Sequence, residues 1–337
     1  MRQVASGNFP SLTVDSESFW NLSQDSAEVL NDSVDSKKDS QTSMNLGRKN
    51  CRSSFSLVLT VMQKTHEMLL TSSENNKTNI RSFYYDLQPE LIPNLTMKKV
   101  NNAVNSAEKL IGCTRWDLGF VATSKGLVAG DLTLNFNEKS ITYLKTRGDL
   151  IPQEMFELSS IRTSAKFVLV VEKDTIFQKL LGEREMCPEY LNCILITGKG
   201  EPDIATRILV HRLSEIERLP TYILVDNDPY GFEILCTYRF GSKEHKPWAS
   251  PSVRWIGIHP EEIKSMGIIP MGLKVREIEK VKTLRTRNDL QSEANLCMQL
   301  RKMKKIGKAE IESVANLSYG FLTRFYIPEK IKLREFY

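Results

Sequence analysis

Three acidic residues directly follow apolar runs of this sequence, at positions that would suit them to hold a metal ion. Glu172 comes after the run KFVLVV, and Asp226 and Asp228 follow the run TYILV in the turn VDNDPYG. If both runs are strands of one open α/β sheet, the three carboxylates lie outside the carboxyl ends of the strands, where such sheets bind ligands. Carboxylate oxygens are hard ligands that suit Mg²⁺. Each motif by itself also fits a simple turn or helix start.

A second candidate site lies at the end of another apolar run. Residues 197–207 (TGKGEPDIATR) carry Lys199 and Arg207, and the glycines would let the backbone approach a phosphate group. We therefore expect Lys199 and Arg207 to contact phosphate or the DNA backbone. A glycine-rich turn without a ligand is the alternative, and Glu201 is unfavourable beside a phosphate.

The second half of the chain has the pattern of a mostly parallel sheet. Short apolar runs alternate with helical segments from Pro152 onward, which is typical of an α/β domain covered on both faces. The expected strands are residues 166–171, 193–197, 221–225 and 253–258. The expected helices are residues 174–181, 203–218 and 231–238, followed by a largely helical segment from residue 287 to the C-terminus.

The first half predicts a smaller α+β domain. Residues 1–47 are rich in Ser, Asp and Asn and are expected to be a disordered tail. Helical periodicity appears around Leu57–Leu69 and again in residues 97–111, where Thr96 is a possible N-cap and Gly112 a natural end. Residues 120–135 contain Gly-turned, strand-prone runs. Helices followed by such a hairpin predict a winged helix, of the CAP-like kind that binds DNA, at residues 48–150, before an α/β domain at 151–337. A small α+β module without DNA contact is the alternative for the first domain.

Composition sets wide limits on the function. The 46 basic and 41 acidic residues leave a net charge of +5, which fits a nucleic-acid partner without requiring one. The six cysteines form no CxxC pair, so we expect a reducing compartment and no zinc site. No signal sequence and no membrane-spanning run is recognised, and the basic clusters in residues 301–305 are expected to be solvated helix faces or nuclear-import signals.

A tyrosine pair, Tyr84 and Tyr85, stands in the segment IRSFYYDL. Such a pair is usually structural, but this segment resembles the catalytic signature of the type IIB topoisomerase A subunit family. Within that family, the sequence is most similar to the eukaryotic meiotic double-strand-break transesterases, homologues of the archaeal topoisomerase VI A subunit. The resemblance runs from about Ser53 to the C-terminus and includes TSKGLVAGDL, FVLVVEKDTIFQKLL, ITGKGEPDIATR and LVDNDPYGFEI.

The resemblance implies a winged-helix domain that carries the nucleophile, joined to a Toprim domain with a Rossmann-like sheet. By matched position, Tyr85 would be the nucleophile and Arg81 would hold the scissile phosphate. Glu172, Asp226 and Asp228 would hold Mg²⁺.

Two further points come from the matched segments. Lys125 of the TSKG sequence joins the residues expected to contact DNA. Ser82 departs from the family, whose members commonly have Asp after the arginine, and this leaves the network around the nucleophile open. A tyrosine hydroxyl has a pKa near 10, so only about one in a thousand is ionised at neutral pH. Arginine and a divalent cation would therefore have to stabilise the charge that develops.

The implied function is a topoisomerase-like cut of double-stranded DNA in the nucleus, on meiotic chromosomes, that initiates homologous recombination. The product would be a 5′-phosphotyrosyl bond, and the enzyme would fall in the isomerase class with the DNA topoisomerases. By resemblance, cleavage would need a homodimer, accessory break-forming proteins and a topoisomerase VI B-like subunit. The alternatives are a Toprim-type magnesium-dependent nuclease, a non-catalytic DNA-binding scaffold, and an archaeal-type topoisomerase subunit that reseals the DNA it cuts.

Overall fold

The computed structural model describes residues 11–14, 42–70, 77–87, 94–121, 124–144, 146–186, 192–241 and 248–337. The chain divides into two compact units, Met1–Thr123 and Ser124–Tyr337. Most of the tail predicted to be disordered, residues 1–47, lies outside the described residues. Its described parts form strands β1 (Ser11–Val14) and β2 (Thr42–Asn45), which pair antiparallel.

Three helices form the core of the first unit: α2 (Lys49–Leu70), α3 (Ile80–Asp86) and α4 (Met97–Ile111). Both predicted ends of α4 are confirmed. Thr96 Oγ1 accepts a hydrogen bond from the Lys99 N–H at 3.3 Å at the start, and Gly112 ends the helix with a φ of 73°. Buried side chains of all three helices pack together around Phe83, whose ring meets Phe120 edge to face.

The second unit is built on a six-stranded sheet in the order β11-β10-β8-β9-β3-β6. The four strands predicted from apolar runs are confirmed as β8 (Phe167–Val171), β9 (Cys193–Thr197), β10 (Thr221–Leu224) and β11 (Arg254–Gly257), and they pair in parallel. Strands β3 (Leu127–Ala129) and β6 (Asp149–Leu150) add an antiparallel edge. The mostly parallel sheet is therefore as expected.

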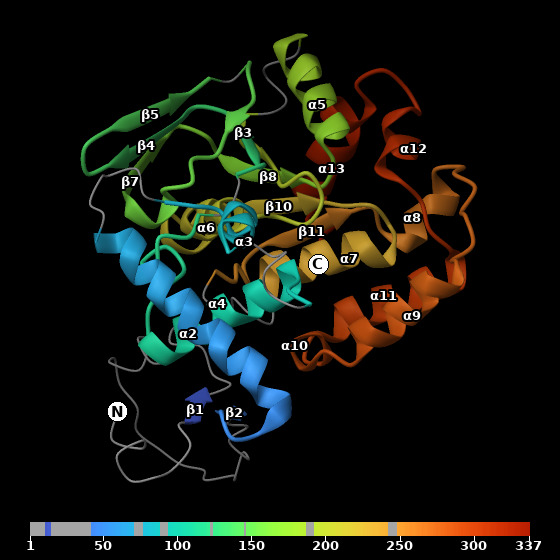
Figure 1. Ribbon diagram of the computed structural model, residues 1–337. Helices are drawn as coiled ribbons and strands as arrows, with labels where there is room; N and C mark the ends of the chain where they lie inside the picture. The colour runs from blue at the N-terminus through green and yellow to red at the C-terminus, as the bar shows by residue number, and fades with distance from the viewer. Residues whose placement is uncertain are drawn as a thin grey trace, which may run out of the picture. The chain divides into compact units, whose positions relative to one another are not determined.

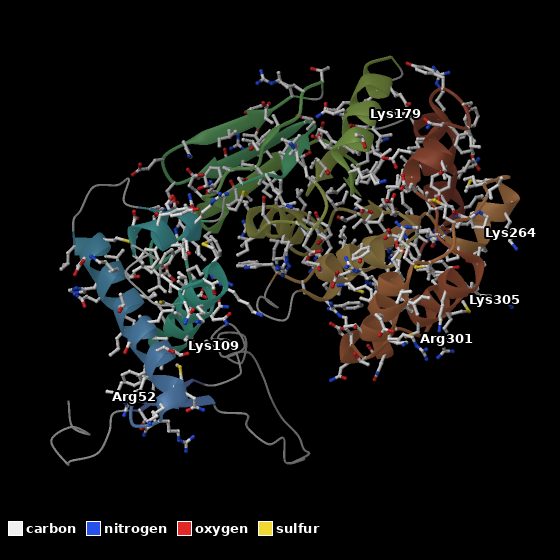
Figure 2. The ribbon with its side chains drawn as sticks, turned by 45° about the vertical axis from the view of Figure 1, so that its right-hand side comes forward. Arg52, Lys109, Lys179, Lys264, Arg301 and Lys305 are labelled. Carbon is white, nitrogen blue, oxygen red and sulfur yellow. The ribbon has the colours of Figure 1, made fainter. Side chains whose placement is uncertain are left out.

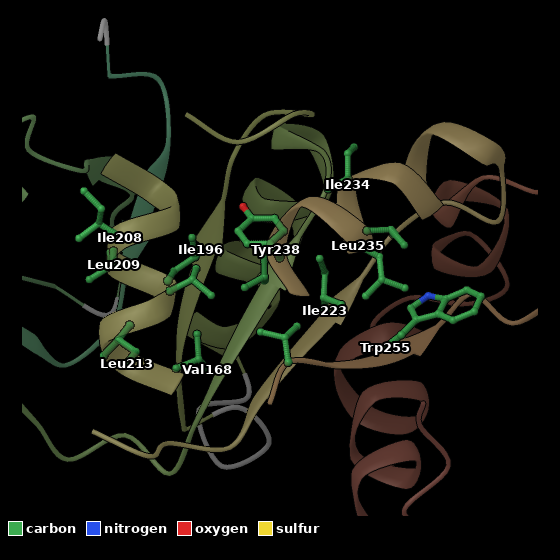
Figure 3. Packing of buried hydrophobic residues seen from close by; sticks show 14 of the residues in the cluster. Val168, Ile196, Ile208, Leu209, Leu213, Ile223, Ile234, Leu235, Tyr238 and Trp255 are labelled. Carbon is green, nitrogen blue, oxygen red and sulfur yellow. The ribbon is translucent and has the colours of Figure 1, made fainter. Parts of the chain in front are cut away.

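Helices cover both faces of this sheet (Figure 1). Along β8, Val168 and Val170 face α6 (Ile204–His211) and α7 (Pro229–Phe240), and Figure 3 shows this packing. Leu169 and Val171 face the other way, in the cluster that contains residues of α5 (Asp174–Met186). Because side chains alternate along a strand, a strand covered on both faces is apolar throughout, which is the pattern that the sequence shows.

The predicted wing hairpin is wrong. Strand β3 pairs with β9, whereas β4 (Leu132–Phe136) pairs with β5 (Ser140–Tyr143) and β7 (Leu158–Thr163) in a separate three-stranded sheet. The chain changes sheet at Gly130, whose φ of 153° and close approach to the Ile194 backbone leave little room for a side chain. Because β3 to β7 belong to the second unit, the division falls after Thr123 and not at the predicted residue 150.

The C-terminal part is largely helical, as predicted. It contains α8 (Pro260–Ser265), α9 (Val275–Arg285), α10 (Asn288–Gln291), α11 (Ala294–Ile306), α12 (Ile311–Ala315) and α13 (Ile327–Leu333). Short 3₁₀ or π turns occur at η2 (Met155–Glu157), η3 (Arg212–Ile216) and η4 (Leu322–Tyr326). Arg301 and Lys305 of α11 are exposed and point away from the ribbon (Figure 2). Among the described residues, no helix has the length and apolar character needed to cross a membrane.

Candidate functional site

The parallel pairing of β8 and β10 brings the predicted acidic residues together. Val171 is the register partner of Leu224, so both strands end at the same level. The Glu172 N–H donates to the Leu224 carbonyl at 3.1 Å, and Glu172 Oε2 accepts from the Asp226 N–H at 2.8 Å. The side chain that follows β8 is thereby fixed against the turn that follows β10. We call Glu172, Asp226 and Asp228 the acidic edge.

Asp228 and Asp226 are held by the elements that follow them. Asp228 caps α7, because its Oδ1 accepts from the N–H groups of Tyr230 and Gly231 at 2.9 and 2.7 Å. Asp226 Oδ1 accepts from the Ile311 N–H at the start of α12, at 2.8 Å. Gly231 is needed in this turn, since an added Cβ would lie 2.5 Å from the Asp226 carbonyl oxygen and 3.0 Å from Glu172 Oε2.

Burial is the main reason why the pKa of Glu172 rises to about 8. Repulsion from Asp226 and Asp228 adds to the rise, whereas the hydrogen bond from the Asp226 N–H lowers this pKa. Burial also raises the pKa of Asp226, although Lys173 and the Ile311 N–H oppose that shift. Ionising all three carboxylates of the acidic edge is therefore unfavourable without an added positive charge, and a bound cation would favour their ionised forms.

Lys173 is the residue of this site that the sequence analysis missed. Its Nζ lies 2.8 Å from Asp226 Oδ2 and 2.6 Å from Glu312 Oε2, and Glu310 Oε2 is 3.7 Å away. Burial lowers the pKa of Lys173, but the bonds to Asp226 and Glu312 outweigh it, so the pKa is raised and the ammonium stays charged. Its place directly after Glu172 was the available signal, but its distant partners in the chain could not be read from the sequence.

The acidic edge fits a magnesium ion by donor type and by charge, with one exception. Glu172 Oε1 and Asp228 Oδ2 accept no hydrogen bond from the described residues, so each can still bind a cation. Both oxygens of Asp226 are engaged, one by Lys173 and one by the Ile311 N–H. In the described part of the chain, no three His, Cys, Asp or Glu side chains are gathered as ligands of one metal ion. Glu172 and Asp228 therefore each have an oxygen available for a cation, whereas both oxygens of Asp226 already have partners.

In the first unit, α3 presents the predicted nucleophile to solvent. Phe83 is buried, whereas Tyr85 is 58% exposed and Arg81 is also exposed. Because Arg81 and Tyr85 are four residues apart in a helix, their side chains lie on one face. Tyr84 is half-buried, and its ring packs edge to face on that of Tyr85 at 5.3 Å. Asn79 caps the helix through the Ser82 N–H, at 2.8 Å.

The loop after β9 brings two of the predicted basic residues together beside Glu172. The Gly200 N–H donates to the Glu172 carbonyl at 2.9 Å, which anchors the loop. Lys199 has a φ of 53° and pairs with Asp174 at 3.3 Å. Lys125 Nζ lies 3.4 Å from the Lys199 carbonyl oxygen. Both lysines therefore lie at the edge of the sheet that carries Glu172.

Arg207 does not join these lysines at the surface, so the prediction that it contacts DNA is corrected. It lies on α6 with 3% of its area exposed, and burial lowers the pKa of its guanidinium while the Glu201 carboxylate raises it. Glu201 accepts a hydrogen bond from Thr237 Oγ1 at 2.7 Å. Glu201, which is unfavourable beside a phosphate, therefore helps to stabilise the charge of the buried Arg207.

Several known proteins are similar to this chain in sequence. The Toprim-domain family model that describes Spo11 together with the topoisomerase 6 A subunit matches residues 167–331, which include the acidic edge. Meiotic recombination protein W68 of Drosophila melanogaster is 36% identical over 83% of this chain and 83% of its own length. Meiotic recombination protein SPO11 of Homo sapiens is 33% identical over 82% of this chain and 71% of its own length. The A3 subunit of DNA topoisomerase 6 from Oryza sativa subsp. indica is 32% identical over 67% of this chain and 53% of its own length. The chain therefore belongs to the Spo11/topoisomerase VI A family.

Proposed function

We propose that this chain is a DNA transesterase that makes meiotic double-strand breaks and so initiates homologous recombination in the nucleus. Family membership supports the class of reaction, and the relatives W68 and SPO11 are named meiotic recombination proteins. The observation that carries the proposal is on α3, where Tyr85 is 58% exposed and Arg81 precedes it by one helical turn. The proposed nucleophile and the arginine assigned to the phosphate therefore lie on one exposed face of α3.

In the proposed reaction, the Tyr85 oxygen attacks the phosphorus of a phosphodiester and the 3′ oxygen of the neighbouring nucleotide leaves. The tyrosine loses its proton, the 3′ oxygen gains one, and the products are a 5′-phosphotyrosyl bond and a 3′-hydroxyl. Arg81 would hold the phosphate oxygens by charge-assisted hydrogen bonds. One phosphodiester replaces another, so the step itself needs no ATP.

We assign Glu172, Asp226 and Asp228 as the residues that would hold Mg²⁺. When bound, such an ion stabilises negative charge on phosphate and leaving oxygens. Lys125 and Lys199 are assigned to the DNA backbone on the same side of the sheet.

The double-strand break is proposed to need two copies of the chain. Each chain supplies one Tyr85, which can become linked to one strand only, so two strands require a homodimer. By family likeness, the Tyr85 of one copy would work with the acidic edge of the other, and accessory proteins together with a topoisomerase VI B-like subunit would activate the pair. The first unit would be the winged-helix DNA-binding domain. Its helical core supports this assignment, although the strands predicted as its wing lie in the second unit.

The test is a covalent-adduct assay on the full chain with its B-like partner, Mg²⁺ and duplex DNA. A 5′-phosphotyrosyl enzyme retains the fragment downstream of the cut, so a label at the 3′ end should remain on denatured protein while a label at the 5′ end should be released. Tyr85→Phe should abolish the adduct. Tyr84→Phe is the matched control, because it removes the hydroxyl of the half-buried neighbour and should leave the adduct in place.

The same assay separates the alternatives. A magnesium-dependent nuclease that activates water would cut DNA without an adduct, and Tyr85→Phe would cut equally well. A non-catalytic scaffold would bind DNA, but neither the wild type nor Tyr85→Phe would cut it. Either result would replace the transesterase proposal.

A further inference from the structure

Lys173 occupies an oxygen that the proposed magnesium site requires. Its ammonium lies 2.8 Å from Asp226 Oδ2, while the other oxygen of that carboxylate binds the Ile311 N–H. A magnesium ion bound to Asp226 would therefore meet a lysine ammonium at contact distance. Two cations cannot share one carboxylate oxygen in a half-buried site without strong repulsion. One of them must move.

Glu312 provides the place to which the ammonium can move. Its Oε2 already lies 2.6 Å from Lys173 Nζ, and its Oε1 accepts from Thr175 Oγ1 at 3.2 Å. Glu310 stands 3.7 Å from the same ammonium. A small shift of the flexible lysine side chain toward α12 would keep its charge paired and free Asp226.

The backbone keeps Glu312 in place during such a shift. Asn227 and Ala309 exchange two hydrogen bonds, of 2.9 and 3.1 Å, and so tie the turn of the acidic edge to the segment before α12. The Asn227 side chain adds a hydrogen bond to the Gly307 carbonyl at 3.0 Å. The alternative partner of Lys173 is thus built into the same local structure as the metal ligands.

We propose that Lys173 is a positioning residue that competes with Mg²⁺ for Asp226 and that Glu312 receives its ammonium when the ion binds. The inference rests on the proposed metal site and deepens it. Lys173 pairs with Asp226 while no ion is bound, and Glu312 lowers the cost of releasing Asp226. Magnesium affinity is then set by a lysine and a glutamate that do not themselves touch the ion.

The test measures magnesium binding to the full chain by isothermal titration calorimetry with MgCl₂, without DNA. Lys173→Met should lower the dissociation constant by about tenfold, because the competitor is gone. Glu312→Gln should raise it by about tenfold, because the ammonium has lost its alternative partner. Thermal unfolding gives a second readout: Lys173→Met should lower the melting temperature in EDTA, and Mg²⁺ should restore it.

A double-mutant cycle distinguishes this competition from the removal of a nearby charge. If Glu312 acts through Lys173, Glu312→Gln should have little effect in the Lys173→Met chain, whereas independent charge effects would add. Asp174→Asn is the matched control. It also removes one carboxylate near the acidic edge, but that carboxylate pairs with Lys199 and not with Lys173.

Two results overturn the inference, and they are distinguishable. Equal dissociation constants for the wild type, Lys173→Met and Glu312→Gln would refute the competition and leave the metal site standing. Absence of any magnesium binding in all of these folded chains would refute the metal site itself and the inference with it.

Discussion

We expect the second unit of the metal-free protein to lose stability as the pH is raised from about 6 to about 8, with Glu172 as the cause. Its pKa in the folded protein is about 8, against 4.5 for an ordinary glutamate. Between these values, the folded state binds a proton that the unfolded chain does not bind. Stability therefore falls as the pH rises through this window, and the loss is complete above the folded pKa.

The magnitude follows from the size of the shift. Each pH unit well inside the window removes about 1.4 kcal/mol from the free energy of unfolding, and the slope declines near the folded pKa. The change from about pH 6 to about pH 8 is therefore about 2 kcal/mol. A magnesium ion on the acidic edge favours the ionised carboxylate, so it should cancel most of this loss.

The effect is measured by urea denaturation and detected by tryptophan fluorescence, to which Trp255, fully buried in the second unit, contributes. Wild type and Glu172→Gln are compared at both pH values, each in EDTA and in MgCl₂. The variant carries no titrating group at this position, so it should lack this loss, and the difference in stability between the two chains should change by about 2 kcal/mol between the two pH values. His259, whose pKa burial lowers to about 4, changes the stability of both chains equally and cancels from that difference. An equal loss in Glu172→Gln, or a gain in the wild type at the higher pH, would refute the assignment to Glu172.

Three further predictions concern single positions. Gly231→Ala should weaken magnesium binding in calorimetry and cost about 1–3 kcal/mol in urea denaturation, because its Cβ would press on the Asp226 carbonyl; an unchanged chain would show that the turn relaxes freely. Thr96→Ala should lower the stability of the first unit by about 1 kcal/mol through loss of the α4 cap, measured by urea unfolding. Lys199→Ala should weaken DNA binding and reduce its salt dependence in anisotropy titrations, whereas Arg207→Ala should act mainly by lowering stability. Equal DNA effects in the two variants would contradict the burial of Arg207.

The strands and the acidic edge were predictable because their signals are local. A strand covered on both faces must be apolar throughout, so β8 to β11 appear as short apolar runs. Parallel strands end at one edge of a sheet, so the residues just after β8 and β10 had to meet once these strands paired. The ends of α4 were equally local, since Thr96 and Gly112 cap it with their own side chain or backbone.

Pairing across the chain was decided only by the tertiary structure. Gly130 and Asp131 look like a hairpin turn, yet β3 pairs with β9 and not with β4. The backbone groups of β9 that form these hydrogen bonds are far away in the sequence, so no local pattern predicts the pairing. Arg207 has the composition of a phosphate contact and becomes buried when α6 packs on the sheet. Lys173 and Glu312 are 139 residues apart, so only the docking of α12 beside β8 and β10 makes them partners. The sequence alone determined which residue types stand at the strand ends and helix caps, through local periodicity, and its resemblance to a family suggested which of them react. The fold decided which of them meet and which are buried, because long-range packing sets burial and charge pairing.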